Sequence, residues 1–358
     1  MKNRIGNLWA LVLAFVVTMG GCQSNPAGPS GSTPGATTGV YVVNEGNYQR
    51  GNATLTFYIP DSNKAYQNVF ALANGRDLGD TGNDIVIYGD KAYIVVNGSQ
   101  KVEVISTADN KSVGTLQLPG QRSPYKIVIL SDAKAYVTNL MDSSVTAFNP
   151  STLQIVFDRI KVGLNPQGIA TANGKLYVCN SGFGSDNTVT VLNAGTGALI
   201  KTMVMSDSPS EVGVGPNSVV IVKCDGKSDY TSSANDTPGS ISVIDTDNDV
   251  IVAQAILPLA TYGHPGRMTV SSKGYGYFNG KTGIIRFSFT SSTLNVGGTP
   301  FSTMQAYGLA IDDVTDRLYA TDPKDYVQLG EVAIIDSKGI EMKRFTTGII
   351  PGAIAFKR

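Results

Sequence analysis

The amino-acid sequence predicts an all-β fold, a seven-bladed β-propeller whose blades are four-stranded antiparallel sheets. Three observations support it: a recurring strand, the spacing of its copies, and the way the chain begins and ends. Seven times a short hydrophobic strand, ending in most copies in Asn or Asp, follows a turn, and the copies lie 52, 43, 41, 43, 57 and 42 residues apart. A repeat of roughly 40 to 45 residues built from short strands is typical of propeller blades. The anchor residues of the copies are Tyr41, Tyr93, Tyr136, Tyr177, Val220, Tyr277 and Tyr319.

Each repeat divides into four predicted strands, as the copy around Tyr136 illustrates. Apolar and β-branched residues dominate the strand segments, and Asn, Asp, Gly and Pro separate them, as expected for strands joined by turns. The predicted strands of this repeat are 135–139, 144–149, 155–162 and 168–172. The next repeat shows the same order, with strands at 176–180, 188–193, 198–204 and 211–215.

The two ends of the chain predict how the ring closes. The propeller region starts on a Tyr-containing strand at Val40, and it ends on Gly352 to Phe356, a segment whose pattern matches that of Pro166 to Ala170. The last strand therefore supplies the innermost strand of the blade that the first strand begins. Such closure removes the exposed sheet edges that invite aggregation. The seven predicted innermost strands are 85–88, 126–130, 168–172, 211–215, 267–271, 308–312 and 353–356.

The first 22 residues are predicted to be a lipoprotein signal peptide and no part of the fold. Lys2 and Arg4 give a positive start, and the apolar run from Leu8 to Val17 is too short to span a bilayer but suits a signal-peptide core. The segment from Met19 to Cys22 resembles the lipobox of bacterial lipoproteins. The resemblance implies cleavage before Cys22 and lipidation of that cysteine, which would anchor the protein to a membrane. Ordinary secretory cleavage nearby is the alternative.

Residues 23–38 are predicted to be a flexible tether between the anchor and the propeller at 39–358. They are mainly Pro, Gly, Ser and Thr, a composition that buries too little apolar surface to fold. Gln23, where an Asp would favour inner-membrane retention, favours the outer membrane. We therefore predict an exported lipoprotein of the outer membrane or the cell surface, and an orientation towards the periplasm stays open.

Charge and cysteine content limit the classes of partner and chemistry. Lys plus Arg and Asp plus Glu number 28 each, and no run of like charges exists, so we predict no nucleic-acid partner. Besides Cys22, the chain contains Cys179 and Cys224 at the ends of equivalent strands in adjacent repeats. An exported protein permits a disulfide between them, and two separate thiols are the alternative.

The sequence predicts neither an enzyme, a metal site nor a cofactor. His264 is the only histidine, which excludes a site with several His ligands and leaves any Ser-His-Asp relay dependent on this one residue. A Gly-rich phosphate loop between a strand and a helix is also missing from the sequence. A propeller hydrolase, such as a lactonase, or a lyase remains the alternative.

The loops at one face of the ring are the predicted ligand site, because the mouth of a propeller is a natural concave surface. On that face we expect the loops that join the second and third strands of each blade, and those that lead from one blade to the next. The insertion 225–239 is the longest of them and explains the 57-residue step. The candidate ligand-binding residues are Tyr48, Arg50, Arg122, Tyr125, Phe183, Tyr230, His264, Arg267 and Tyr326.

The segment Tyr136-Val137-Thr138-Asn139 resembles the eponymous motif of the YVTN-repeat β-propellers. This resemblance extends over 39–358 and implies a surface or periplasmic binding protein. The front of the domain, with Asn44-Glu45-Gly46-Asn47 and the segment Leu78 to Ile85, is similar to propeller lipoproteins of Bacteroidetes. One branch of those captures cobalamin and other corrinoids and passes them to an outer-membrane transporter.

The leading hypothesis is a lipid-anchored protein that binds a small-molecule nutrient or an envelope protein at its loop face. Corrinoid capture for an outer-membrane transporter is its sharper form, implied by the resemblance. A protein-interaction scaffold in the envelope is the second hypothesis, and the propeller enzyme is the third.

Overall fold

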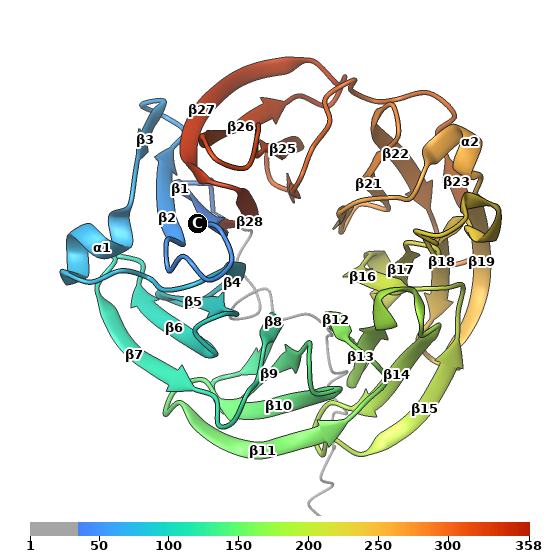
Figure 1. Ribbon diagram of the computed structural model, residues 1–358, viewed down its shortest axis with the longest axis horizontal. Coiled ribbons are helices and arrows are strands. Elements are labelled where there is room, and N and C mark those ends of the chain that lie inside the picture. Colours follow the sequence, from blue (N-terminus) through green and yellow to red (C-terminus); the bar gives the residue numbers. More distant parts are fainter. Residues whose placement is uncertain (1–34) are drawn as a thin grey trace, which may run out of the picture.

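The computed structural model describes residues 35–358 as a closed ring of seven sheets, which confirms the predicted seven-bladed β-propeller (Figure 1). Each sheet has four strands, and every neighbouring pair of strands is antiparallel. Cys22, the signal peptide and most of the tether lie outside the described residues. None of the helices in the described part of the chain has the length and apolar character needed to cross a membrane.

The blades follow the chain order, and the innermost strand comes first in all but the first blade. Blade 1 contains β1 (Gly39–Asn44), β2 (Thr54–Ile59), β3 (Lys64–Tyr66) and the last strand, β28 (Pro351–Lys357). Blade 2 contains β4 (Gly82–Tyr88), β5 (Lys91–Val96), β6 (Lys101–Ser106) and β7 (Ser112–Gln117). Blade 3 contains β8 (Pro124–Ser131), β9 (Lys134–Asn139), β10 (Ser144–Asn149) and β11 (Gln154–Lys161). Blade 4 contains β12 (Pro166–Ala172), β13 (Lys175–Asn180), β14 (Thr188–Asn193) and β15 (Leu199–Val204).

The remaining three blades repeat this order. Blade 5 contains β16 (Pro209–Val214), β17 (Val220–Cys224), β18 (Gly239–Asp245) and β19 (Val250–Leu257). Blade 6 contains β20 (Met268–Ser271), β21 (Tyr275–Gly280), β22 (Gly283–Phe289) and β23 (Leu294–Val296). Blade 7 contains β24 (Leu309–Asp312), β25 (Arg317–Asp322), β26 (Leu329–Ile335) and β27 (Glu341–Ile349). The predicted innermost strands agree with the structure to within three residues at each end.

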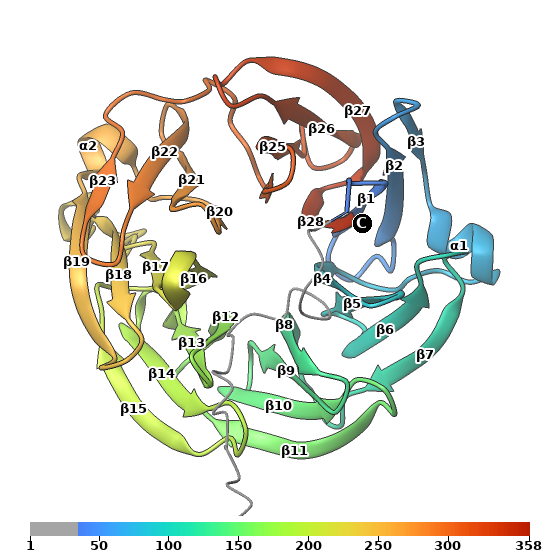
Figure 2. The same cartoon turned by 180° about the vertical axis from the view of Figure 1, so that it is seen from behind.

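The ring closes as the sequence predicts, through the pairing of β28 with β1. Their register runs from Gly39 opposite Lys357 to Asn44 opposite Pro351, with a bulge before the last pair. Both views of the ring show β28 inserted on the inner side of β1, next to the C-terminus (Figures 1 and 2). The first and last strands of the propeller are thus neighbours in one sheet.

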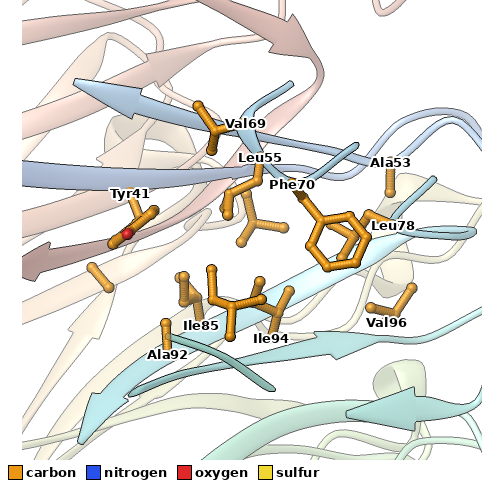
Figure 3. Packing of buried hydrophobic residues seen from close by; sticks show 13 residues of the cluster. Tyr41, Ala53, Leu55, Val69, Phe70, Leu78, Ile85, Ala92, Ile94 and Val96 are labelled. Carbon is orange, nitrogen blue, oxygen red and sulfur yellow. The ribbon is translucent and has the colours of Figure 1, made fainter. Parts of the chain in front are cut away.

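Buried side chains between neighbouring blades form the core. All six residues of β1 are buried, because this strand has a blade on either side of its sheet. Tyr41 and Leu55 of blade 1 pack with Ile85 and Ile94 of blade 2 in a single cluster (Figure 3). A short helix, α1 (Val69–Asn74), adds Val69 and Phe70 to this cluster and accounts for the long first step of the repeat. The sequence analysis missed α1, since six residues are too few to show helical periodicity.

The tyrosine of the repeat links each blade to the next one. In four successive blades its buried hydroxyl donates a hydrogen bond to the turn between the third and fourth strands of the following blade. The bonds are Tyr41 Oη to Asn110 Oδ1 (2.6 Å), Tyr93 Oη to Pro150 O (3.1 Å), Tyr136 Oη to Ala194 O (2.8 Å) and Tyr177 Oη to Asp249 Oδ1 (2.6 Å). Burial raises the pKa of Tyr41 and of Tyr93 to about 12, so both hydroxyls keep their protons and act as donors. The most regular feature of the sequence is therefore a structural contact.

Candidate functional site

A polar cavity of about 550 Å³ opens at the centre of the ring on the predicted loop face. Blades 3 to 7 supply its lining, from the starts of their innermost strands and from the loops between their second and third strands. The charged and aromatic residues of the lining are Tyr125, Glu211, Lys223, Asp225, Arg267, Tyr307, Asp322, Lys324 and Tyr326. The sequence places these residues together because equivalent segments of every blade end at the same mouth.

Arg267, directly before β20, is the central residue of the cavity wall. Its Nη1 donates to Glu211 Oε1 at 3.0 Å, and its Nη2 lies 3.7 Å from Glu45 Oε1. Its guanidinium also lies over the ring of Tyr125, 5.5 Å from the centroid, which is a cation–π contact. Burial alone lowers the pKa of Arg267, but Tyr125, Glu211 and Glu45 raise it well above the usual range, so this residue stays charged.

The two carboxylates beside Arg267 differ in protonation behaviour. Burial raises the pKa of Glu45, and the attraction of Arg267 and a 2.8 Å hydrogen bond from Tyr307 offset this rise only in part. Burial also acts on Glu211, but Lys126, Arg267 and Lys223 outweigh it and lower the pKa of Glu211 below its ordinary value. Glu211 is therefore the firmly ionised partner of Arg267. Glu45 Oε1 has no hydrogen-bond partner among residues 35–358.

Charged residues occupy equivalent positions on or next to the innermost strands of four of the seven blades. Asp84, Lys126 and Glu211 lie on the innermost strands β4, β8 and β16, at the position that Arg267 holds in blade 6. Lys126 Nζ donates to Asp84 Oδ1 at 3.2 Å, so neighbouring blades are also paired by charge. Small residues hold the same position in the other blades: Gly168, Gly308 and Ala353. The sign of the charge thus alternates from Asp84 to Arg267 along the chain, and Gly168 of blade 4 interrupts the series.

A second ion pair, between Lys223 and Asp225, lies on the blade 5 side of the cavity. Lys223 Nζ contacts Asp225 Oδ1 and donates to Pro265 O at 3.1 Å. Ser210 Oγ donates to the same carboxylate oxygen at 2.6 Å. This carboxylate is already hydrogen-bonded by two donors, so it is a poor candidate for a free general base.

Aromatic and amide side chains complete the wall on the side of blades 6 and 7. The rings of Tyr307 and Tyr326 meet edge to face, with centroids 6.0 Å apart. Asn279 Oδ1 accepts from the backbone of Ala306 at 3.0 Å, and Gln305 Nε2 donates to Lys281 O at 3.1 Å. These contacts hold the amides in place at the cavity surface.

The structure brings three of the predicted ligand-binding residues into the cavity wall: Tyr125, Arg267 and Tyr326. His264 lies beside the cavity and does not line it. Its Nδ1 is 3.0 Å from Asp225 O, and its Nε2 is 3.6 Å from Asp236 Oδ2. Four others lie on exposed loops outside the lining: Tyr48, Arg50, Phe183 and Tyr230.

The prediction for Arg122 is wrong. Its side chain is only 1% exposed and lies in an ion-pair network within blade 3. Its Nη2 donates to Asp158 Oδ2 at 2.9 Å, and its Nε lies 2.7 Å from Asp142 Oδ2 without hydrogen-bond geometry. Arg122 thus stabilises a blade and offers no group to a ligand. The sequence shows a cation beside an aromatic residue there, but not the carboxylates that bury it.

The sequence analysis did not single out Glu45, Glu211, Lys223 and Tyr307. A signal for Glu45 existed in the segment Asn44-Glu45-Gly46-Asn47, which follows the first strand. Glu211 begins a predicted innermost strand at the position of Lys126, so the alignment of the repeats contained its signal. Lys223 and Tyr307 are hidden within or directly before strands, where polar residues are more often structural.

The two cysteines of the described chain lie outside the cavity lining. Cys179 and Cys224 are both buried free thiols in this structure, which is the alternative to the possible disulfide. Burial raises the pKa of Cys224 to about 12, which keeps that thiol protonated. Among residues 35–358, no three His, Cys, Asp or Glu side chains are grouped so that they could hold a metal ion.

A family model described as a domain of unknown function (DUF5074) matches residues 38–346. The chain belongs to this family. The match covers nearly the whole ring, from the first strand to the last strand of blade 7. None of the curated proteins matches this sequence.

Several solved structures share the architecture at low sequence identity. A quinonprotein alcohol dehydrogenase-like protein from Bacteroides thetaiotaomicron has a TM-score of 0.67 and 16% identity, over 89% of this chain and 78% of that one. Kuenenia stuttgartiensis hydrazine synthase has a TM-score of 0.64 and 17% identity, over 76% and 88%. Virginiamycin B lyase from Staphylococcus aureus has a TM-score of 0.55 and 12% identity, over 79% and 91%. Such likeness shows the fold alone, because one fold hosts many functions.

Proposed function

We propose that this member of the DUF5074 family is a non-enzymatic binding protein of the cell envelope that holds a small polar molecule in the loop-face cavity. The observation that carries the proposal is the cavity itself, whose volume of about 550 Å³ lies within the usual range of ligand pockets. Arg267, Glu211 and Tyr125 form a preorganised wall for it, because their mutual contacts hold each side chain in place. Preorganisation lowers the entropic cost of binding.

The state of the charged groups supports binding rather than catalysis. Arg267 and Lys223 are each held by a carboxylate. A general acid or base needs a proton that it can exchange near neutral pH, and Arg267, whose pKa its carboxylate and tyrosine neighbours raise well above the usual range, offers none. His264, the residue on which an enzyme hypothesis depends most, lies outside the lining.

Corrinoid capture is a second, more specific candidate within this proposal. It is favoured by Glu45, which belongs to the front-end segment that resembles the corrinoid-capturing lipoproteins and which contacts Arg267 and Tyr307 at the cavity. Kinship with the YVTN-repeat propellers is part of the same proposal and rests on Tyr136 to Asn139.

Isothermal titration with cyanocobalamin tests the corrinoid candidate. The protein to use is the chain from Gln23 on, which lacks the signal peptide and Cys22 and therefore carries no lipid. We expect heat of binding at micromolar concentrations, and we expect Tyr326→Ala to weaken it, since this half-exposed ring stands at the mouth. A titration without heat would exclude corrinoids and leave other small molecules to be tested.

We also propose that the protein is anchored to the outer membrane through lipidated Cys22. The segment Met19 to Cys22 and the polar stretch after it support this location. In cells fed radiolabelled palmitate, the wild-type chain is expected to carry label and float with outer membranes, whereas Cys22→Ser is expected to lose both properties. Label that persists in Cys22→Ser would contradict the anchor.

A further inference from the structure

The charges that line the loop-face cavity cancel one another. Among the described lining residues, three are basic (Lys223, Arg267 and Lys324) and three are acidic (Glu211, Asp225 and Asp322), so their sum is zero. Each of the six also has an opposite charge beside it. Arg267 pairs with Glu211 at 3.0 Å, Lys223 with Asp225, Lys324 with Glu331 at 3.1 Å and Asp322 with Arg344 at 3.4 Å. A charged ligand group would have to compete with one of these pairs and leave its partner unmatched, which is costly in a partly buried site.

The same ion pairs suit a ligand that both donates and accepts hydrogen bonds. An arginine has five N–H donors and a carboxylate has about four acceptor positions, so the pair of Arg267 and Glu211 keeps capacity beyond its own contact. It therefore presents donors next to acceptors. Neighbouring hydroxyl groups match this arrangement, because each hydroxyl is a donor and an acceptor at once. The amides of Gln167, Asn279 and Gln305 extend the same kind of surface.

Half of the apolar residues in the described lining are aromatic. Tyr125, Tyr307 and Tyr326 supply ring surfaces, whereas the only non-aromatic apolar side chains among the described lining residues are those of Pro265, Ala306 and Pro323. A mainly hydrophobic ligand would therefore bury little of its surface against apolar side chains of this cavity. A sugar ring has one or two faces of C–H groups that pack on aromatic rings while its hydroxyls reach polar neighbours.

From this combination we infer that the ligand is an uncharged carbohydrate. The inference rests on the proposed function and narrows it to one chemical class. Compensated charges recognise hydroxyl groups, aromatic rings recognise the faces of the sugar, and neither requires a charge on the ligand.

A glycan array that carries neutral and acidic glycans tests the class, with the chain from Gln23 on as the probe. We expect the bound glycans to be neutral. An array without binding, or binding confined to sialylated, sulfated or uronic-acid glycans, would overturn the inference. The strongest neutral ligand is then titrated in 50 and 500 mM NaCl, and its affinity is expected to change by less than about twofold, since salt screens charge–charge attraction and hardly affects neutral hydrogen bonding. A weakening of tenfold or more would also overturn the inference.

Two matched tyrosine variants test whether the glycan binds in the loop-face cavity. Tyr326 and Tyr66 are similarly exposed, at 49% and 46%, but Tyr326 lines the cavity and Tyr66 lies on β3 at the outer edge of the ring. Tyr326→Ala is expected to weaken neutral glycan binding by about tenfold, the loss typical of one aromatic contact. Tyr66→Ala is expected to leave it unchanged. Equal effects of the two variants would show that the glycan binds elsewhere and would contradict the inference.

The failure of this inference can be told apart from failure of the proposed function. If no glycan binds but cyanocobalamin does, and Tyr326→Ala weakens that binding, the cavity is a ligand site for another class and only the carbohydrate inference falls. If Tyr326→Ala alters the binding of no ligand that the protein is found to hold, both fall.

Discussion

A chain that ends at Ile350, and therefore lacks β28, is expected not to fold into a soluble ring. The truncation removes every residue that pairs with the inner side of β1, from Gly39 to Asn44. It leaves one edge of the fully buried strand β1 unpaired, since β1 then pairs only with β2, and it removes Ala355 from the core between blades 1 and 2. We expect aggregated protein, or soluble protein without a cooperative thermal transition in circular dichroism.

A circular permutant is the control for this truncation. Gly39 and Lys357 are opposite one another in the register, so a short linker can join Arg358 to Gly39. New ends can be opened between Tyr230 and Thr231, in an exposed loop. The permutant keeps all 28 strands of the described chain and is expected to unfold cooperatively, near the wild-type temperature. A truncated chain that folds as well as this permutant would refute closure by β28.

Arg122→Ala is expected to lower the free energy of unfolding by about 3–5 kcal/mol, the usual cost of removing one partner from a buried ion pair. The variant leaves Asp142 and Asp158 without their buried cation and removes the hydrogen bond from Arg122 Nη1 to Thr146 Oγ1 (3.1 Å). Urea denaturation at neutral pH measures the loss. Ligand binding at the cavity is expected to survive in the folded fraction, because Arg122 is no part of the lining.

Arg159 provides a matched control in the same network. Its Nε lies 3.4 Å from Asp142 Oδ2, but its side chain is 61% exposed. Arg159→Ala is expected to cost at most about 1 kcal/mol, as solvent already screens this pair. If the two variants were equally stable, burial would not be what makes the Arg122 contacts strong.

The fold could be predicted because the burial of each strand leaves a pattern in consecutive residues, and this pattern repeats in every blade. Each second strand is covered by neighbouring blades on both faces, so it must be a run of apolar and β-branched residues such as Val40 to Val43. The tyrosine within it adds a bond to the next blade, and so it repeats at the period of the blade. The closing strand could be predicted because the propeller region starts on the second strand of a blade and ends on an innermost strand.

The site could be predicted only in part, because it depends on contacts between residues that are far apart in the chain. Tyr125 follows Pro124, and Arg267 comes two residues after Pro265. Both residues are therefore expected near turns, where polar and aromatic side chains suggest function. Glu45 and Glu211, however, gain their roles from Arg267, which is more than 50 residues away from either one in the chain. Arg122 shows the opposite error, since its neighbours in the sequence resemble those of Arg267 but its neighbours in space bury it.

Asp84, Lys126, Glu211 and Arg267 share one position of the blade, so each of these four blades contributes one charged side chain there. The other three blades have Gly168, Gly308 and Ala353 at this position. A Cβ on Gly168 or on Gly308 would come closer than 3.0 Å to a backbone oxygen of the next blade, that of Ser210 or of Gly352. Close contact between the backbones of neighbouring blades therefore keeps these two positions free of side chains, and the charge of the mouth can be varied without moving the backbone only in the other five blades.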